Sequence, residues 1–572
     1  MINFKIRIDL ARRLQFQAVG LFRRSSFVIR HLPSTVAIAV VASLLNGCTR
    51  PPTRVGYGDR EQILFYGNGA EPQDVDSQIV TGVPEDHIIT ALFEGLVSED
   101  PHDLHPVPGV AERWEVSRDA RTYTFHLRKN AQWSNGTRVT AQDFVRSYQR
   151  ILMPSLAAEY AYMLYVVTNA EAFNKGQITD FSRVGFQALD ESTLQMQLNA
   201  PASYFLSLLN HYSWFPVPVS VIERCGPIDQ RGNRWTRPEN FVGNGPFVLT
   251  HWRINDVLVV KKSPTYWDAD QVRLREIRFY PIESFEDQER AFRAGQLHVT
   301  YEAPLSKIDS YKQQHPDLIR IDPYLGSYIY RLNVTKPPLN DKRVRRALAM
   351  AVDRVAIATQ VRRAGEAPAY CFTPANTAGY TCQARLPFDI EAARKLLAEA
   401  GYPDGKGFPR LTLMYNTLET HRAIAEAVQQ MWRKNLNIDI QLENQEWKVY
   451  LDNQRTLNYE IGRHAWIADY VDPKSFIDKF ITGGGNNQTG WSNPEYDRLL
   501  AEAERAPNNQ ERYELYQKAE AILLEEAPII PVYHYTHPFL LSPSVQGWYP
   551  TLLDHHPYKY VWLKPQPENL IN

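Results

Sequence analysis

The sequence lacks an excess of charge of either sign. Its 572 residues contain 63 lysines and arginines against 64 aspartates and glutamates, which gives a formal net charge of -1. A nucleic-acid-binding protein needs a basic surface to displace phosphate counterions, so this balance argues against that class. Hydrophobic residues make up 44% of the chain and charged residues 22%, which is typical of a globular protein.

Common catalytic motifs are also missing. The segment GYPDGKGFP (401–409) lacks the Lys-Ser/Thr ending of a phosphate-binding loop. There is no G-x-S-x-G and no H-E-x-x-H sequence. The pairs His555-His556 and His534/His537 do not have the spacing of a standard metal site, and we interpret them as scattered histidines. We therefore predict that the protein is not an enzyme and needs neither a metal nor another cofactor.

No apolar run is long enough to cross a membrane, which takes about 20 residues. The run VAIAVVASLL (36–45) follows a basic N-terminal segment and precedes Cys48. A basic segment, a short apolar run and small residues are typical of a secretory signal. Leu45-Asn46-Gly47-Cys48 resembles a bacterial lipobox, which predicts removal of residues 1–47, a lipid on Cys48 and a tether over 48–56. Secretion without a lipid and an uncleaved anchor remain the alternatives.

Cysteine is scarce, with four in the whole chain. Cys371 and Cys382 flank the loop FTPANTAGYT. In an oxidising compartment this spacing suits a disulfide bond, although two reduced thiols remain possible. Cys225 is left over, and we interpret it as a small buried side chain.

The length exceeds what one hydrophobic core supports, about 250–300 residues, so we expect at least two lobes. Alternating polarity predicts strands at 122–128, 193–199 and 257–263. Helical periodicity predicts helices at 141–152 after Thr140, 339–358, 390–400 after Asp389, 421–435, 494–506 from Pro494 and 509–527. The order strand 411–416, helix 421–435, strand 438–445, short helix and strand 459–469 indicates a parallel unit and an α/β fold.

Several motifs occur in a fixed order along the chain. They are Trp114, the alternating stretch 122–128, Trp133, Asn135-Gly136 and Thr140–Phe144, followed by NFVGNGPFVLTHW (240–252), PPLNDKRVRRALAMAVDR (337–354), EAARKLLAEAGYP (391–403) and ADYVDPKSF (468–476). With them the chain resembles the extracytoplasmic solute-binding proteins of peptide ABC importers, family 5, over roughly residues 60–550. Segments 415–454 and 463–470 are most similar to the oligopeptide-binding proteins of that family.

The resemblance implies a set of peptide-binding residues. Asp469 matches the carboxylate that binds a peptide's α-ammonium, and Arg463 and His421 match groups that bind the C-terminal carboxylate. Tyr160 matches a tyrosine at the N-terminal end of the ligand. Val83 and the backbone of Ala465–Ile467 match segments that hold the peptide as a strand, and Trp466 and Trp447 are expected to line side-chain pockets. Some relatives carry a disulfide where Ile467 and Gly326 stand here.

Simple geometry supports this assignment. On an unbroken strand Arg463 and Asp469 face the same side, with Cα atoms roughly 20 Å apart. Their side chains leave about 11 Å between them, close to the roughly 9–10 Å between the charged ends of a tripeptide. Each residue alone also has an ordinary interpretation. Asp469 could cap a turn, Arg463 could form a surface ion pair, His421 could face water, and the aromatic residues could simply pack in the core.

The resemblance implies an α/β clamshell of the periplasmic-binding-protein type with an extra lobe. We expect lobe I to comprise 57–93, 218–320 and 533–572, the inserted lobe II 94–217, and lobe III 321–532. The expected function is capture of short peptides, about two to five residues long, and delivery to an ABC permease by an exported, monomeric lipoprotein. A different solute, such as a dipeptide, a murein peptide or a nickel complex, and a receptor for a sensor are the alternatives.

Overall fold

Three β-sheets of four, four and six strands organise the computed structural model, which describes residues 53–506 and 508–565. The predicted signal segment, Cys48 and most of the tether lie outside these residues. No helix in the described ranges is long and apolar enough to span a membrane. Residues from Thr53 onward pack into one compact unit, so the lobe boundaries stay a prediction.

The first sheet has the strand order β1-β10-β9-β8, with β1 parallel to β10 and the other pairs antiparallel. Its strands are β1 (Ile63–Gly67), β8 (Phe247–Arg253), β9 (Val257–Lys262) and β10 (Glu276–Tyr280). The helices of this region are α3 (Arg54–Glu61), α4 (Val83–Leu92), α8 (Val219–Cys225), α9 (Phe285–Arg293) and α10 (Ile308–Gln314). All five residues of β1 are buried, as expected for a strand covered on both faces.

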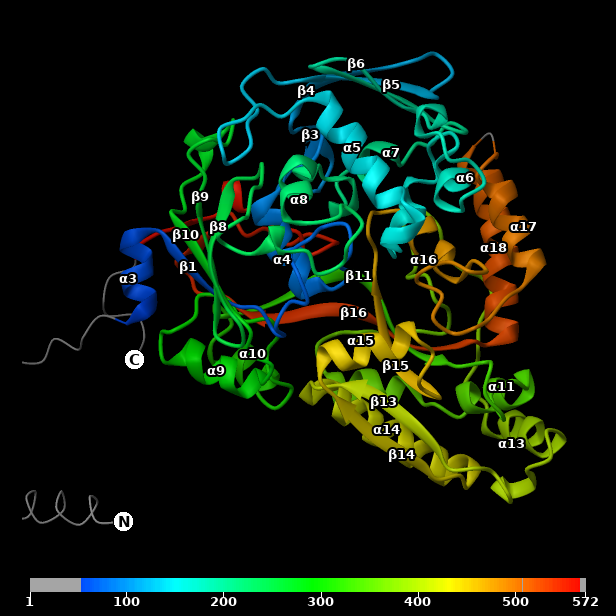
Figure 1. Cartoon of the computed structure of the whole chain (residues 1–572). Helices are drawn as coiled ribbons and strands as arrows, with labels where there is room; N and C mark the ends of the chain where they lie inside the picture. The colour runs from blue at the N-terminus through cyan, green and yellow to red at the C-terminus, as the bar shows by residue number, and fades with distance from the viewer. Residues whose placement is uncertain (1–52, 507, 566–572) are drawn as a thin grey trace, which may run out of the picture. The chain divides into compact units, whose positions relative to one another are not determined.

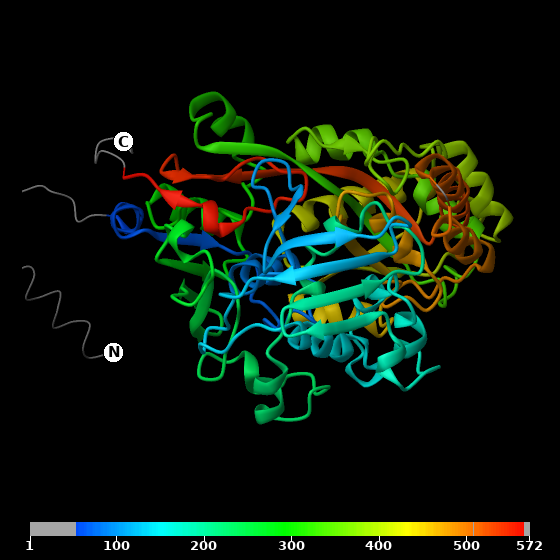
Figure 2. The same cartoon turned by 90° about the horizontal axis from the view of Figure 1, so that it is seen from above.

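The second sheet is antiparallel, in the order β4-β5-β7-β6. It contains β4 (Ala111–Val116), β5 (Thr122–Leu127), β6 (Phe186–Asp190) and β7 (Thr193–Gln197), with the hairpin β2 (Val97–Glu99) and β3 (Pro106–Pro108) and the helices α5 (Ala141–Leu152), α6 (Ala170–Asn174) and α7 (Phe205–Leu208). Buried residues alternate along β5 and β7, so one face packs on α5 and the other faces outward (Figures 1 and 2). The capping box of Thr140 and Asp143 starts α5 as predicted.

The third sheet has the order β12-β16-β11-β15-β13-β14. Its strands are β11 (Ile319–Leu332), β12 (Ala367–Pro368), β13 (Leu411–Asn416), β14 (Ile440–Gln445), β15 (Ile461–Ile467) and β16 (Ile529–Leu540). The parallel unit predicted from 411 onward is confirmed, since β13 is parallel to both β14 and β15. The long strands β11 and β16 run side by side across the centre of Figure 1 and cross the predicted lobe boundaries near 320 and 532.

Eight helices of the described chain accompany this third sheet. They are α11 (Lys342–Met350), α12 (Arg354–Ala356), α13 (Ile390–Glu399), α14 (Glu419–Leu436), α15 (Trp447–Arg455), α16 (Lys474–Ile477), α17 (Pro494–Ala503) and α18 (Asn509–Glu526). Asp389 caps α13 and Gly401, at φ +100°, follows its end as predicted. A short two-stranded pair, β17 (Val545–Gln546) and β18 (Trp562–Leu563), lies near the C-terminus.

Two predicted elements need correction. The helix predicted over 339–358 is broken after Met350, because the Asp353 side chain caps a new helix by accepting from the Ala356 backbone N–H. The strand predicted over 459–469 ends at Ile467, so Asp469 lies beyond it. The assumption of an unbroken strand from Arg463 to Asp469 is therefore wrong.

A buried ion pair joins α5 to the segment between β1 and α4. The Arg150 guanidinium, fully buried, donates to both carboxylate oxygens of Asp76 at 3.1 and 2.7 Å. Asp76 also accepts from the Trp235 indole at 3.2 Å. This ion pair therefore connects α5, which packs on the second sheet, to the segment that follows β1 of the first sheet.

Replacement of Arg150 tests whether its ion pair with Asp76 stabilises the fold. Arg150→Met is expected to lower the free energy of unfolding by about 3–5 kcal/mol, because Asp76 is left buried without its cation. On the same helix Arg146 pairs with Glu223, both partly exposed, so Arg146→Met is expected to cost at most about 1 kcal/mol. Denaturant unfolding followed by fluorescence compares the two, and equal effects of both replacements would contradict the structural role of Arg150.

Candidate functional site

A single cavity of about 620 Å³ lies where segments attached to all three sheets meet. This is within the usual range for ligand pockets, about 300–1,000 Å³. Its walls come from the start of α4, the loop near Tyr160, the end of β13, the start of α14, the start of α15 and residues 463–469 of β15 and beyond. All nine residues predicted to bind peptide line it, namely Val83, Tyr160, His421, Trp447, Arg463, Ala465, Trp466, Ile467 and Asp469.

Strand β15 offers the cavity an unpaired edge. One edge pairs with β11 from Ile461 to Ile467, including the Gly326–Ile467 pair. The other edge pairs with β13 only at Ile461 and Gly462, and no further strand of the described chain joins it. Backbone groups from Arg463 to Ile467 therefore border the cavity, which is the arrangement that accepts an added strand.

At one end of the cavity the Asp469 carboxylate is buried without a cation in ion-pair contact among the described residues. Its side chain is 7% exposed and accepts from the Tyr160 hydroxyl at 3.2 Å. The His211 imidazole lies 3.5 Å away, and burial lowers its pKa to about 3, which keeps it neutral. Burial raises the pKa of Asp469 itself to about 7. A cationic group placed here would relieve the cost of burying this charge.

A second carboxylate lies near the same end. Asp86, in the first turn of α4, lines the cavity, and burial raises its pKa to about 6. Neither Asp86 nor His211 stands out in the sequence, because their position depends on contacts between segments far apart in the chain. The only local signal is the acidic first turn of α4 in GVPED.

At the other end the Arg463 guanidinium is buried and has no carboxylate partner in the described chain. It donates to the Asn416 side chain at 3.3 Å and to the Tyr535 hydroxyl at 3.1 Å. Its central carbon lies 5.0 Å from the Tyr328 ring centre. The neighbouring Arg362, by contrast, is neutralised by Glu302 at 2.6 Å and Glu366 at 2.7 Å. Arg463 is therefore the cation at this end that is available to an anionic ligand group.

His421 lies in the first turn of α14, beside Arg463. It is 4% exposed, and neither ring nitrogen has a hydrogen-bond partner. Burial lowers its pKa far below the ordinary value, and the charges of Arg463 and Arg362 lower it further. A neutral imidazole can still donate one N–H to a carboxylate, and the helix N-terminus favours an anion at this position.

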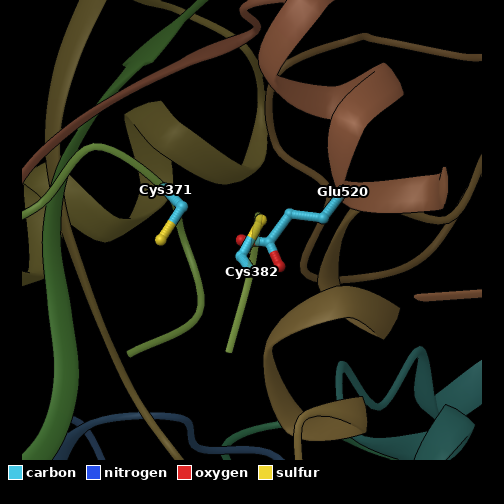
Figure 3. Close-up of side chains that lie close together, drawn as sticks. All are labelled: Cys371, Cys382 and Glu520. Atoms are coloured by element: carbon cyan, nitrogen blue, oxygen red, sulfur yellow. The ribbon is translucent and has the colours of Figure 1, made fainter. Parts of the chain in front are cut away.

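The predicted disulfide bond is not formed in the structure, where Cys371 and Cys382 are both free thiols (Figure 3). Their sulfur atoms and the Glu520 carboxylate lie within 4.8 Å of one another. The Cys371 thiol donates to the Thr373 carbonyl at 3.3 Å and the Cys382 thiol to that of Ala384 at 3.5 Å. Glu520 instead fastens this loop, because it accepts two backbone N–H groups and the Tyr380 hydroxyl.

Within the described ranges two clusters bring metal-binding atoms together. One is Cys371, Cys382 and Glu520, and the other is the exposed group Asp100, Asp103 and His105. Both lie outside the cavity lining. The Glu520 carboxylate already accepts three hydrogen bonds, two from backbone N–H groups and one from the Tyr380 hydroxyl.

The chain is similar to known proteins over most of its length. Residues 105–488 match the family described as bacterial extracellular solute-binding proteins, family 5 Middle. The chain is 38% identical over 528 residues to the periplasmic oligopeptide-binding protein OppA of Salmonella typhimurium, covering 90% of this chain and 94% of that protein. The structure of Haemophilus influenzae OppA in complex with the peptide RPPGFSPFR superposes with a TM-score of 0.84 at 35% identity, covering 88% and 99% of the two chains.

Two structures of murein tripeptide-binding proteins called MppA, one of them from Escherichia coli, differ in how closely they superpose on this chain. Both are 36% identical to this chain and cover 88% of it, with 98% and 97% of their own lengths matched. The TM-score is 0.83 for one but 0.59 for the unliganded open form. The described residues therefore have an arrangement unlike that open form, and the fold is the α/β clamshell with an extra lobe. Sequence and structure together show that the chain belongs to family 5 of the bacterial extracellular solute-binding proteins.

Proposed function

We propose that the protein captures short peptides in the cavity and delivers them to an ABC permease. The observation that carries the proposal is the pair of buried, unpaired charges at the two ends of one cavity, with an unpaired strand edge between them. Every peptide has an ammonium group, a carboxylate and a backbone, whatever its sequence. A site that binds these three features accepts many sequences, while water fills unused space around the side chains.

In this proposal the ligand runs antiparallel to β15. Its ammonium group pairs with Asp469 and its carboxylate pairs with Arg463, with His421 as a further donor. Tyr160 holds the Asp469 carboxylate, and the backbone of Ala465–Ile467 pairs with the ligand. Val83, Trp447 and Trp466 form walls around the ligand side chains. Lobes I and III close on the peptide by bending at β11 and β16, the two strands that cross the proposed lobe boundaries.

The ammonium end is tested by Asp469→Asn. Loss of one partner of a buried ion pair costs about 3–5 kcal/mol, so binding of tri-alanine with a free amine is expected to weaken by at least about 100-fold. N-acetylated tri-alanine should bind poorly to the unmodified protein and lose little more in the variant. Isothermal titration calorimetry on the four combinations separates the specific effect from misfolding, which would weaken both peptides alike and remove Asp469 from the ammonium site.

The same end predicts a pH dependence. The empty site binds a proton at Asp469 with a pKa of about 7, whereas the ammonium-bound site favours the ionised carboxylate. Binding therefore weakens as the pH falls below about 7, because the proton competes with the ligand's ammonium group for Asp469. The pH dependence of binding should be measured by calorimetry for both the unmodified protein and Asp469→Asn, because the variant should lose it. Asp452→Asn, a change in an exposed residue of the cavity rim paired with Arg455, should retain it.

The carboxylate end is tested by Arg463→Gln. Truncation of one member of a buried, hydrogen-bonded charge pair costs about 2–5 kcal/mol, so tri-alanine with a free carboxylate should bind at least about 30-fold more weakly. Tri-alanine amide should bind the unmodified protein weakly and be almost insensitive to the change. Arg422→Gln is a matched control on the exposed side of α14, where the arginine pairs with Glu426. A loss that is the same for the acid and the amide would exclude Arg463 as the carboxylate partner.

We further propose that the mature protein is an envelope lipoprotein that acts as a monomer. Residues 1–47 are removed, Cys48 carries the lipid, and export brings Cys371 and Cys382 into an oxidising compartment where the neighbouring thiols form a disulfide. Intact mass spectrometry of the mature protein should find an acyl mass on Cys48 and a gain of two hydrogen atoms on reduction. Cys48→Ser should shift the protein from the membrane to the soluble fraction. A mature chain without acyl mass, or no mass change on reduction, would contradict the respective part.

A further inference from the structure

A side pocket of the cavity lies beside Trp466. It is defined here by six residues that line the cavity, namely Glu159, Gln454, Arg455, His464, Asn486 and Gln488. Trp466 lies in the sequence between Arg463, on β15, and Asp469, just beyond the end of this strand, which are the proposed partners of the ligand's two ends. The side chain of the middle residue of a bound tripeptide therefore lies next to this pocket.

A buried arginine supports the pocket from behind. Arg331, on β11, is 0% exposed and donates to the side-chain oxygens of Gln454 and Gln488 and to the Asn486 carbonyl at 3.0 Å. All three acceptors are uncharged. No carboxylate of the described chain forms an ion pair with Arg331, so its charge is solvated by neutral dipoles that themselves face the cavity.

A buried lysine lies behind the same wall. Lys479 is 1% exposed, and its ammonium group has no hydrogen-bond partner. It lies 3.5 Å from the ring centre of Trp466, the residue that faces the ligand. Burial lowers the pKa of Lys479, and the charge of Arg331 lowers it further. An unpaired polar group this deeply buried costs free energy that an anion nearby would recover.

The charges around the pocket do not balance. Arg455 pairs with Asp452 at 2.5 Å, and Arg231 lies 3.9 Å from Glu159. The backbone of Gly485 packs closely against that of Glu159, because a Cβ atom added to Gly485 would lie 2.8 Å from the Glu159 carbonyl oxygen. Arg331 and Lys479 form no ion pair in the described chain, although the charge of Glu159 acts on both. The charge of Asp469 also acts on Lys479, and under the proposed function Asp469 pairs with the ligand's ammonium group.

We propose that the side pocket recognises an acidic side chain, so that the protein prefers peptides with aspartate or glutamate as the middle residue. The inference rests on the proposed function, which fixes the direction and position of the peptide. The carboxylate of such a residue accepts hydrogen bonds from the amide groups of Gln454 and Gln488 and from His464. It also adds a negative charge near Arg331 and Lys479, neither of which forms an ion pair in the described chain. A lysine at this position adds a third positive charge and is rejected.

Tripeptides that differ only at the middle residue test this preference by calorimetry. Ala-Glu-Ala is expected to bind at least about tenfold more tightly than Ala-Gln-Ala, which has the same shape, and Ala-Lys-Ala is expected to bind most weakly. Lys479→Met keeps the contact with Trp466 but removes the charge, so it should reduce the Glu-to-Gln preference several-fold. Lys448→Met is the matched control, because this lysine lines the cavity near Glu85 and away from the side pocket.

A second variant keeps the preference testable if Lys479→Met does not fold. Gln488→Glu places a carboxylate against Arg331 without a change of size, and it should weaken Ala-Glu-Ala while improving Ala-Lys-Ala. Equal binding of the Glu, Gln and Lys peptides, with tri-alanine still bound, overturns the side-pocket inference alone. Failure of tri-alanine itself to bind overturns the proposed function and the inference with it.

Discussion

The cost of burying charge without a partner is the constraint on which the site depends. Asp469 and Arg463 both line one cavity, and in the described chain Asp469 forms no ion pair with a lysine or arginine and Arg463 forms none with a carboxylate. The raised pKa of Asp469 reflects the free-energy cost of burying its charge. A molecule with an ammonium group at one end and a carboxylate at the other recovers free energy at both sites together. Under the proposed function, selectivity for free peptide termini would follow from this arrangement, without contacts to any particular side chain.

Elsewhere the same chain pairs its buried charges. Arg150 meets Asp76, Arg362 meets Glu302 and Glu366, and Arg512 meets Asp472. Most of these pairs connect segments that are far apart in the sequence, whereas Arg362 and Glu366 are four residues apart. A missing ion pair alone does not identify a ligand-binding group, because the fully buried Arg354 donates only to backbone carbonyls. The side pocket is assigned an acidic ligand group because Arg331 and Lys479, which form no ion pair in the described chain, lie behind the cavity wall.

Local patterns in the sequence predicted much of the fold. Thr140, Asp389 and Pro494 mark helix starts that the structure confirms, because capping depends on neighbouring residues. Hydrophobic periodicity missed the break at Asp353, where a cap within the run restarts the helix. It also extended β15 past Ile467. The ordered motifs predicted nine residues that the structure places in one cavity. The sequence analysis missed four others, namely Asp86, His211, Arg331 and Lys479. Their importance depends on burial and missing partners, which only the three-dimensional arrangement reveals.

Native mass spectrometry of the protein purified without refolding is the most direct test of peptide capture. If the cavity closes around its ligand as proposed, molecules bound in the cell should remain bound during gentle purification. The expected result is a mixture of short peptides with free amino and carboxyl ends, released when the protein is denatured. Recovery of a single non-peptide solute, bound with the cavity residues intact, would contradict the assignment.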